Sequence, residues 1–194
     1  MTAITLNLNP IIHFTDEQFY QVCQANRDVR FERTAKGELI VMPPTGGETS
    51  RRNFKLSQQL ANWADADGTG VGFDSSGGFK LPNGADRSPD AAWVRLERWE
   101  ALTPEQRRKF PPLAPDFLVE LRSATDDLKS LQDKMKEYRD NGVRLGWLID
   151  PQNQRVEIYR LGQEVEVLQS PAMLLGEDVL PGFVLELKWI FELS

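Results

Sequence analysis

The segment "DFLVELRS" carries two charged side chains, Glu120 and Arg122, inside a run that otherwise has the composition of a buried β-strand. Successive side chains of a strand alternate between its two faces, so Leu118, Glu120 and Arg122 are expected to share one face. An ionised carboxylate is costly to bury unless it is paired with a cation or bound to a metal. Glu120 therefore needs a partner, and the type of partner decides which chemistry is available.

Asp90 is the first candidate to share a site with Glu120. It opens the short run "DAAWV" directly after Pro89, and Asp90, Ala92 and Val94 should lie on one face of that strand. If the two strands are neighbours, the two carboxylates converge and require a proton or a cation between them. Magnesium suits such a pair, because it binds one or two carboxylates together with several waters. The alternative is structural: "SPD" is also a common turn sequence, and Glu120 could pair with Arg122 or another arginine.

Lys134 is the candidate cation from the segment that follows. A helix is predicted from Asp126 or Asp127 to about Asn141, with an apolar stripe and with Lys134 at the edge of that stripe. At this position its ammonium can reach the side of the helix that faces the sheet. The alternative is that the lysine stem only covers apolar surface while its charge stays in water.

Composition limits the other chemistries. The chain has 194 residues, which fits one domain spanning 1–194, and its single cysteine and single histidine exclude a disulfide framework and any site that needs several imidazoles. The net charge of −6 argues against a broadly basic surface for nucleic acids. The basic clusters "SRRNFK" and "RRKF" are interpreted as solvated helix faces. Without a signal-like or membrane-spanning run, the protein is expected in the cytoplasm.

The remaining elements predict an α/β fold with a mixed sheet. Helices are expected at "TDEQFYQVCQAN", from Glu48 or Thr49 to Ala66, and as two short helices in "RLERWEALTPEQRRKF". Hairpins are expected for "VRFERT" with "ELIVMPP", around "PNGA", and around Gly162. The order strand, helix, strand between 116 and 150 predicts a parallel crossover. The C-terminal run "FVLELKWIFEL" could belong to the core or to an interface, and we favour the core.

Several of these segments together resemble one known family. The quoted motifs are "PPTGGE", "RSPDAAWV", "DFLVELRSATDDL", "LQDKMKEY", "NGVRLGWLIDP" and "LPGFVLEL". In this order they resemble the Uma-type restriction endonuclease family of the PD-(D/E)XK nuclease superfamily, over nearly the whole chain. The resemblance implies a restriction-endonuclease-like core, in which a central mixed sheet is flanked by helices and extended by β-hairpins. It also implies a divalent metal, Mg²⁺ with Mn²⁺ as a substitute, bound by Asp90, Glu120 and the carbonyl of Leu121, with Glu48 as an additional acid.

One position departs from the superfamily pattern. The motif lysine would fall at position 122, where this chain has Arg122, which stays charged and cannot serve as a base as lysine can. Lys134 is similar to the migrated lysine of relatives and would orient or help deprotonate the attacking water, while Arg122 would face the scissile phosphate. Tyr138 is interpreted as core packing.

Three functions remain open from the sequence. The first is a Mg²⁺-dependent DNA endonuclease, for which a homodimer is expected because double-strand cleavage usually needs two sites. The second is a catalytically silent module that binds nucleic acid or a partner protein. The third is a protein whose acids all form structural salt bridges. No motif indicates a recognition sequence or the type of nucleic acid.

Overall fold

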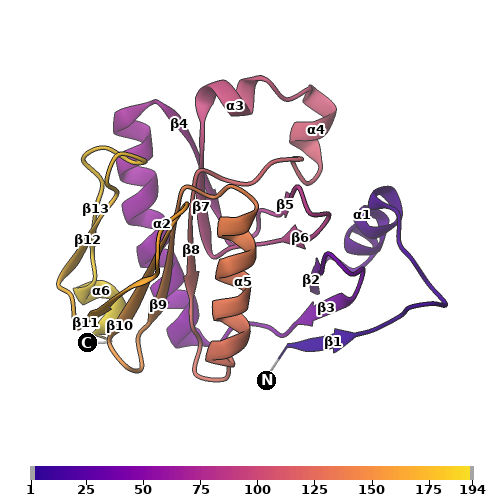
Figure 1. Cartoon of the computed structure of the whole chain (residues 1–194), viewed down its shortest axis with the longest axis horizontal. Helices are drawn as coiled ribbons and strands as arrows, with labels where there is room; N and C mark the ends of the chain where they lie inside the picture. Colours follow the sequence, from indigo (N-terminus) through magenta and orange to yellow (C-terminus); the bar gives the residue numbers. More distant parts are fainter. Residues whose placement is uncertain (1–2, 193–194) are drawn as a thin grey trace.

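The computed structural model of the chain describes residues 3–192, which form a six-stranded sheet, a five-stranded sheet and a two-stranded sheet together with six helices. The strands of the six-stranded sheet lie in the order β11-β10-β9-β8-β7-β4 (Figure 1). Their bounds are β4 Gly70–Asp74, β7 Ala91–Arg95, β8 Phe117–Leu121, β9 Leu145–Asp150, β10 Arg155–Arg160 and β11 Glu166–Gln169.

The pairing of β7 with β8 brings the two predicted acids together. These strands are antiparallel, with Ala91 opposite Val119, and the Asp90 N–H donates to the Val119 carbonyl at 3.0 Å. Continued by one residue, this register places Asp90 opposite Glu120. β8 and β9 are parallel and are joined through helix α5, Leu128–Asp140, which confirms the predicted crossover and the mixed sheet.

Helices cover both faces of the six-stranded sheet (Figure 1). On one face, helix α2, Gly47–Asp67, packs Leu56 and Leu60 against Phe117 and Val119 of β8. On the other face, Met135 and Tyr138 of α5 pack against Leu118 and Leu148. The alternation predicted for β8 is therefore present, and Glu120 lies on the α5 face.

The caps explain where these helices begin and end. The side chain of Asp127 accepts a hydrogen bond from the Ser130 N–H and starts α5. Gly142, in the left-handed region with φ 99°, follows the end of that helix, as a C-terminal glycine commonly does. α2 ends in the same way at Gly68, φ 70°. The predicted helix boundaries agree with these to within two residues.

The five-stranded sheet lies beside the α5 face and carries the N-terminal helix α1, Asp16–Ala25 (Figure 1). Its strands lie in the order β1-β3-β2-β6-β5. Their bounds are β1 Ile4–Leu6, β2 Arg30–Arg33, β3 Leu39–Met42, β5 Phe79–Lys80 and β6 Asp86–Arg87. The predicted hairpins β2 with β3 and β5 with β6 are present in this sheet, and the third, β10 with β11 around Gly162, is present in the six-stranded sheet.

The C-terminal run forms more than one element. The small sheet consists of β12, Met173–Leu175, and β13, Val184–Glu186, and is followed by helix α6, Lys188–Phe191. Leu185, Leu187 and Ile190 are buried as expected for core residues, whereas Val184 and Trp189 are exposed. The preference for a core role is thus correct for one face of this run only.

The two remaining helices are short and lie at one end of the sheet (Figure 1): α3, Leu96–Glu100, and α4, Pro104–Arg108. α4 has the predicted Thr103 cap, because the Thr103 side chain accepts from the Gln106 N–H. No helix within residues 3–192 has the length and apolar character that crossing a membrane requires.

Candidate active site

Asp90 is half-buried and held by two hydrogen bonds that come from two elements. Its Oδ1 accepts from the Asn53 side chain of α2 at 2.9 Å, and its Oδ2 accepts from the Leu121 N–H at the end of β8 at 2.7 Å. Burial raises the pKa of Asp90, although the bond from Leu121 lowers it in part. The carboxylate is therefore fixed in orientation by α2 and β8, and Asn53 is a site residue that the sequence did not indicate.

Glu120 lies on the same side of the sheet and is only 5% exposed. Its Oε1 accepts from the Tyr138 hydroxyl at 3.0 Å and lies 2.8 Å from the Lys134 ammonium. Its Oε2 accepts no hydrogen bond from any residue in the described range 3–192. Burial raises the pKa of Glu120 to about 7; the charge of Lys134 opposes this, and the negative charges of Asp90 and Glu32 add to it. The negative charge of Asp90 therefore opposes the ionisation of Glu120.

Lys134 extends from α5 to the sheet, as its position at the edge of the apolar stripe indicates. Its ammonium lies 2.7 Å from Glu32 and 2.8 Å from Glu120, and its side chain is only 10% exposed. Burial lowers the pKa of Lys134, but the charges of Glu120 and Glu32 outweigh burial, so this pKa lies above its ordinary value. Lys134 is held as a cation between two acids rather than extended into water.

Glu32, on β2, is the acid that the sequence analysis missed. It is 3% exposed, and its carboxylate accepts from Lys134, from the Arg87 guanidinium at 3.0 Å and from the Ser88 N–H at 3.0 Å. Burial raises the pKa of Glu32, but Lys134 and Arg87 outweigh it, so the pKa lies below its ordinary value. A signal was available, because Glu32 is a charged residue inside a predicted strand, just as Glu120 is.

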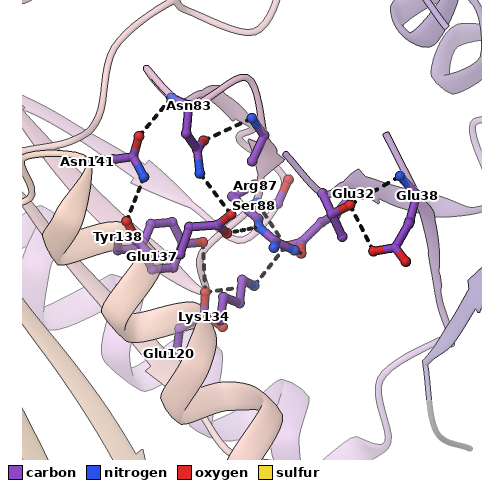
Figure 2. Close-up of polar contacts among 12 residues, drawn as sticks. Glu32, Glu38, Asn83, Arg87, Ser88, Glu120, Lys134, Glu137, Tyr138 and Asn141 are labelled. Atoms are coloured by element: carbon purple, nitrogen blue, oxygen red, sulfur yellow. Dashed lines mark hydrogen bonds and ion pairs between the residues drawn. The ribbon is translucent and has the colours of Figure 1, made fainter. Parts of the chain in front are cut away.

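A second set of contacts ties the segment before Asp90 to α5 (Figure 2). Arg87 donates to Glu137 at 2.6 Å, and the Asn83 side chain donates to the same carboxylate at 3.0 Å. The Asn83 N–H also donates to the Asn141 side chain at 2.8 Å. These bonds hold the loop that leads into Asp90 against the helix that carries Lys134.

Arg122 does not lie where we expected it. Its guanidinium pairs with Asp150 at 2.8 Å and donates to the Asp126 carbonyl at 3.2 Å. The Arg122 N–H still donates to the Ile149 carbonyl of β9 at 2.9 Å, so position 122 lies beside Asp150, and the ion pair with Asp150 holds the guanidinium there. Of the two predicted bases, Lys134 contacts Glu120, whereas Arg122 contacts Asp150.

The two remaining expected ligands differ in position. Leu121 follows Glu120 directly and contacts Asp90 through its N–H. Glu48 lies in the first turn of α2 with its side chain 73% exposed, 3.8 Å from Arg52. Within residues 3–192, no three Asp, Glu, His or Cys side chains converge as a metal site. The donors brought together are therefore two carboxylates and nearby backbone groups.

One cavity of about 850 Å³ lies between α2, α5 and the strands of the five-stranded sheet, and it is lined by Glu32, Glu48, Asp90, Glu120 and Lys134. Its apolar wall comes from Phe31, Ile40 and Met42 on β2 and β3. Its charged residues are mainly acidic, eight acids and three bases: Glu32, Glu48, Asp90, Glu120, Asp126, Asp127, Asp133 and Glu137, with Arg30, Arg87 and Lys134. The oxygen donors fit a hard divalent cation such as Mg²⁺, which needs few protein carboxylates.

The fold belongs to a class that includes a solved nuclease-like structure. A protein from Anabaena variabilis, described as "a putative nuclease belonging to DUF820", has the same fold with a TM-score of 0.75 and 20% sequence identity, over 92% of this chain and 97% of that chain. Residues 16–188 match the family Uma2, described as "Putative restriction endonuclease", and the chain belongs to this family. No curated protein matches the sequence. The predicted family and fold class are confirmed.

Proposed function

We propose that this protein is a Mg²⁺-dependent DNA endonuclease that hydrolyses phosphodiester bonds. The observation that carries the proposal is the pair of half-buried Asp90 and buried Glu120, which faces one cavity together with the ammonium of Lys134. Two acids on neighbouring strands, one of which raises the pKa of the other through its charge, are typical of a cation site. Membership of the Uma2 family supports the same reading.

Asp90 and Glu120 would hold the metal, with Mn²⁺ as a substitute for Mg²⁺. The Leu121 carbonyl would be an additional donor, and Glu48 an acid at the edge of the cavity. When bound, the ion would activate a water for attack on phosphorus and offset the charge that develops on the phosphate. Asn53 and the Leu121 N–H keep the Asp90 carboxylate in one orientation, so the site is organised before any ligand enters.

Lys134 acts in this proposal through charge and position. Because its pKa is raised, its ammonium remains protonated and stabilises the ionised form of Glu120. The Tyr138 hydroxyl donates to the same oxygen of Glu120 and fixes it further. Arg122 has no direct part, since Asp150 and the Asp126 carbonyl hold its guanidinium.

The second candidate function is a catalytically silent module that binds nucleic acid or a partner protein. It is supported by the position of Arg122, which takes the place of the motif lysine and forms a structural ion pair with Asp150. Under either function we propose a cytoplasmic protein, and for the endonuclease a homodimer with two sites.

Isothermal titration with Mn²⁺, with and without a short DNA duplex, tests the proposal. We expect stoichiometric binding that is lost in Asp90→Ala and in Glu120→Ala. The control is Asp178→Ala, which removes an exposed acid outside the cavity and should bind as the unchanged protein does. Circular dichroism verifies that each variant is folded.

The outcomes separate the candidates. Metal binding with Mg²⁺-dependent cleavage of plasmid DNA, both lost in the two variants, supports the endonuclease. Metal binding without cleavage favours the silent module. If the well-folded protein binds no Mn²⁺ even with DNA present, the metal site does not exist and the proposal fails.

A further inference from the structure

Several exposed apolar side chains lie on adjacent elements at the C-terminal side of the molecule. Twelve large apolar residues are exposed within residues 3–192, and five of them lie on adjacent elements: Phe54, Met173, Leu175, Val184 and Trp189. We refer to these five as the C-terminal apolar face. Their exposed fractions range from 42% for Val184 to 66% for Phe54. Exposed apolar side chains that gather in one place often mark an interaction site, whereas scattered ones do not.

The small sheet contributes the aliphatic half of this face. Leu175 is paired opposite Val184, and Met173 opposite Glu186. Leu174 and Leu185 point inward and are 2% and 0% exposed. Strand alternation therefore places Met173, Leu175 and Val184 together on the outer side of β12 and β13.

Helices α6 and α2 contribute the aromatic half. The Trp189 indole N–H donates to the Glu186 carboxylate at 3.2 Å, which joins α6 to β13. The Lys55 ammonium lies 5.6 Å from the Trp189 ring and 5.9 Å from the Phe54 ring, which joins α6 to α2. β12, β13, α6 and α2 lie on the side of the molecule opposite α5 (Figure 1). The five side chains are thus connected through contacts and form one surface.

We propose that the C-terminal apolar face binds a second copy of this chain about a two-fold axis. Its aliphatic half offers no aromatic plane for a nucleic-acid base, whereas a like aliphatic patch is a suitable partner for it. Its charges are also self-complementary. Glu186 and Lys188 are adjacent, 2.9 Å apart, and both are about half exposed. In a two-fold interface the same patch faces itself, so Glu186 of one copy can meet Lys188 of the other, and the reverse pair forms as well.

The position of this face is compatible with two open sites. None of its five residues lines the cavity that holds Asp90 and Glu120. Association through this face would leave both cavities accessible and place two of them on one particle. The inference concerns association alone and does not depend on the proposed endonuclease activity.

Sedimentation equilibrium of the full chain tests the proposal. We expect a mass of twice 22.1 kDa for the unchanged protein, and of 22.1 kDa for Leu175→Glu and Val184→Glu, which bring a charge into the interface. The two residues are 57% and 42% exposed and point away from the core, so the substitutions should leave the fold intact, as circular dichroism verifies. Matched controls are Ile11→Glu and Leu161→Glu, at exposed apolar residues outside this face, and both should remain dimeric.

A mixing experiment tests the two-fold pairing directly. Glu186→Lys leaves two lysines on the face, and Lys188→Glu leaves two glutamates, so each variant alone should be largely monomeric through like-charge repulsion. When the two variants are mixed, every cross pair becomes complementary, and a heterodimer should form. A folding defect could not be rescued in this way.

Three results would overturn the proposal. One is a monomeric mass for the unchanged protein at the highest concentration that remains in solution. Another is a dimer that survives Leu175→Glu and Val184→Glu but dissociates in Ile11→Glu, which would assign the interface to the N-terminal region. The third is a monomer whose affinity for a single-stranded oligonucleotide falls in Phe54→Ala and Trp189→Ala, which would assign this face to nucleic acid.

Discussion

Glu120 combines burial with several neighbouring charges, and this makes the stability of the metal-free protein depend on pH. Its pKa is raised from an ordinary 4.5 to about 7 in the folded protein, mainly through burial. A carboxyl with a raised folded pKa contributes stability that is fully present below pH 4.5 and is lost as the pH rises through 7. The ionised site is therefore less stable than the protonated site.

Replacement of Glu120 by Gln should remove this dependence. Glutamine cannot ionise, so above pH 7 the variant should unfold with a free energy up to about 3 kcal/mol larger than that of the unchanged protein, and below pH 4.5 the two should be similar. Urea denaturation between pH 4 and 8 without divalent metal measures this difference. A constant difference over this range would show that Glu120 does not titrate as described.

Arg122 is predicted to stabilise the fold rather than the reaction. It donates to Asp150, which is 2% exposed. Burial raises the pKa of Asp150, but its hydrogen bonds from Asn153 and Arg122 outweigh burial and hold the pKa below its ordinary value. Arg122→Ala should lower the free energy of unfolding at pH 7 by about 1–3 kcal/mol, because a buried acceptor loses its charged partner.

The stability that Arg122 contributes should depend on pH, because it depends on the ionisation of Asp150. The pKa of Asp150 is depressed, so its stabilising contribution is present above its unfolded pKa of 3.8 and is lost as the pH falls through the folded pKa. The cost of Arg122→Ala should therefore shrink toward pH 3. Mn²⁺ affinity should be unchanged. If a folded Arg122→Ala variant lost metal binding, Arg122 would be shown to contribute to the metal site.

The site is built from side chains of both helices and strands. Each of five elements contributes one side chain: Asn53 from α2, Asp90 from the entry to β7, Glu120 from β8, Lys134 from α5 and Glu32 from β2. The register of β7 against β8 sets the distance between the two acids, and α5 crosses the sheet above them. Any change that shifts β7 should therefore affect the site from a distance.

Edge strand β4 offers a test of how tightly β7 is held. A Cβ on Gly70 would lie 2.4 Å from the Trp93 ring and from the Val94 carbonyl oxygen, whereas a Cβ on Gly72 in the same strand would contact nothing within 4 Å. Gly70→Ala should lower the free energy of unfolding by about 1–3 kcal/mol through overpacking against β7. Gly72→Ala should be nearly neutral. Equal costs in thermal denaturation would show that the close approach of β4 to β7 is wrong.

The molecule as a whole presents an acidic cavity to any substrate. Eight acids and three bases line it, and the net charge of the chain is −6. A polyanion should be repelled from this cavity unless cations neutralise part of its charge. Association with nucleic acid should therefore depend on divalent metal.

Fluorescence anisotropy with a labelled DNA duplex measures this dependence. At constant ionic strength, affinity should rise by an order of magnitude or more when Ca²⁺ or Mg²⁺ is added, about 1.4 kcal/mol for each tenfold step. The rise should be absent in Asp90→Ala and Glu120→Ala. Equally tight binding in a chelator would indicate that DNA binds at a surface other than the cavity.

The sequence alone determined most of the secondary structure and the face of its strand on which each of the two acids lies, whereas the pairing of the two strands came from the structure. Alternation along "DAAWV" and "DFLVE" placed Asp90 and Glu120 on one face, and the apolar stripe of α5 placed Lys134 at the edge nearest the sheet. These inferences succeeded because side-chain direction in a regular strand or helix follows from local backbone geometry. The same reasoning did not identify the partner of Arg122, because Asp150 comes from the neighbouring strand β9.

Only the tertiary structure decided which charges meet. Glu32 and Glu120 are 88 positions apart in the sequence, yet they share the Lys134 ammonium, because the five-stranded sheet packs beside the α5 face. Arg87, Asn53 and Asp150 likewise acquire their partners from distant segments. Long-range contacts of this kind depend on how whole elements pack, and side-chain type and spacing carry little information about them. The same packing leaves one side of the C-terminal run buried and the other exposed.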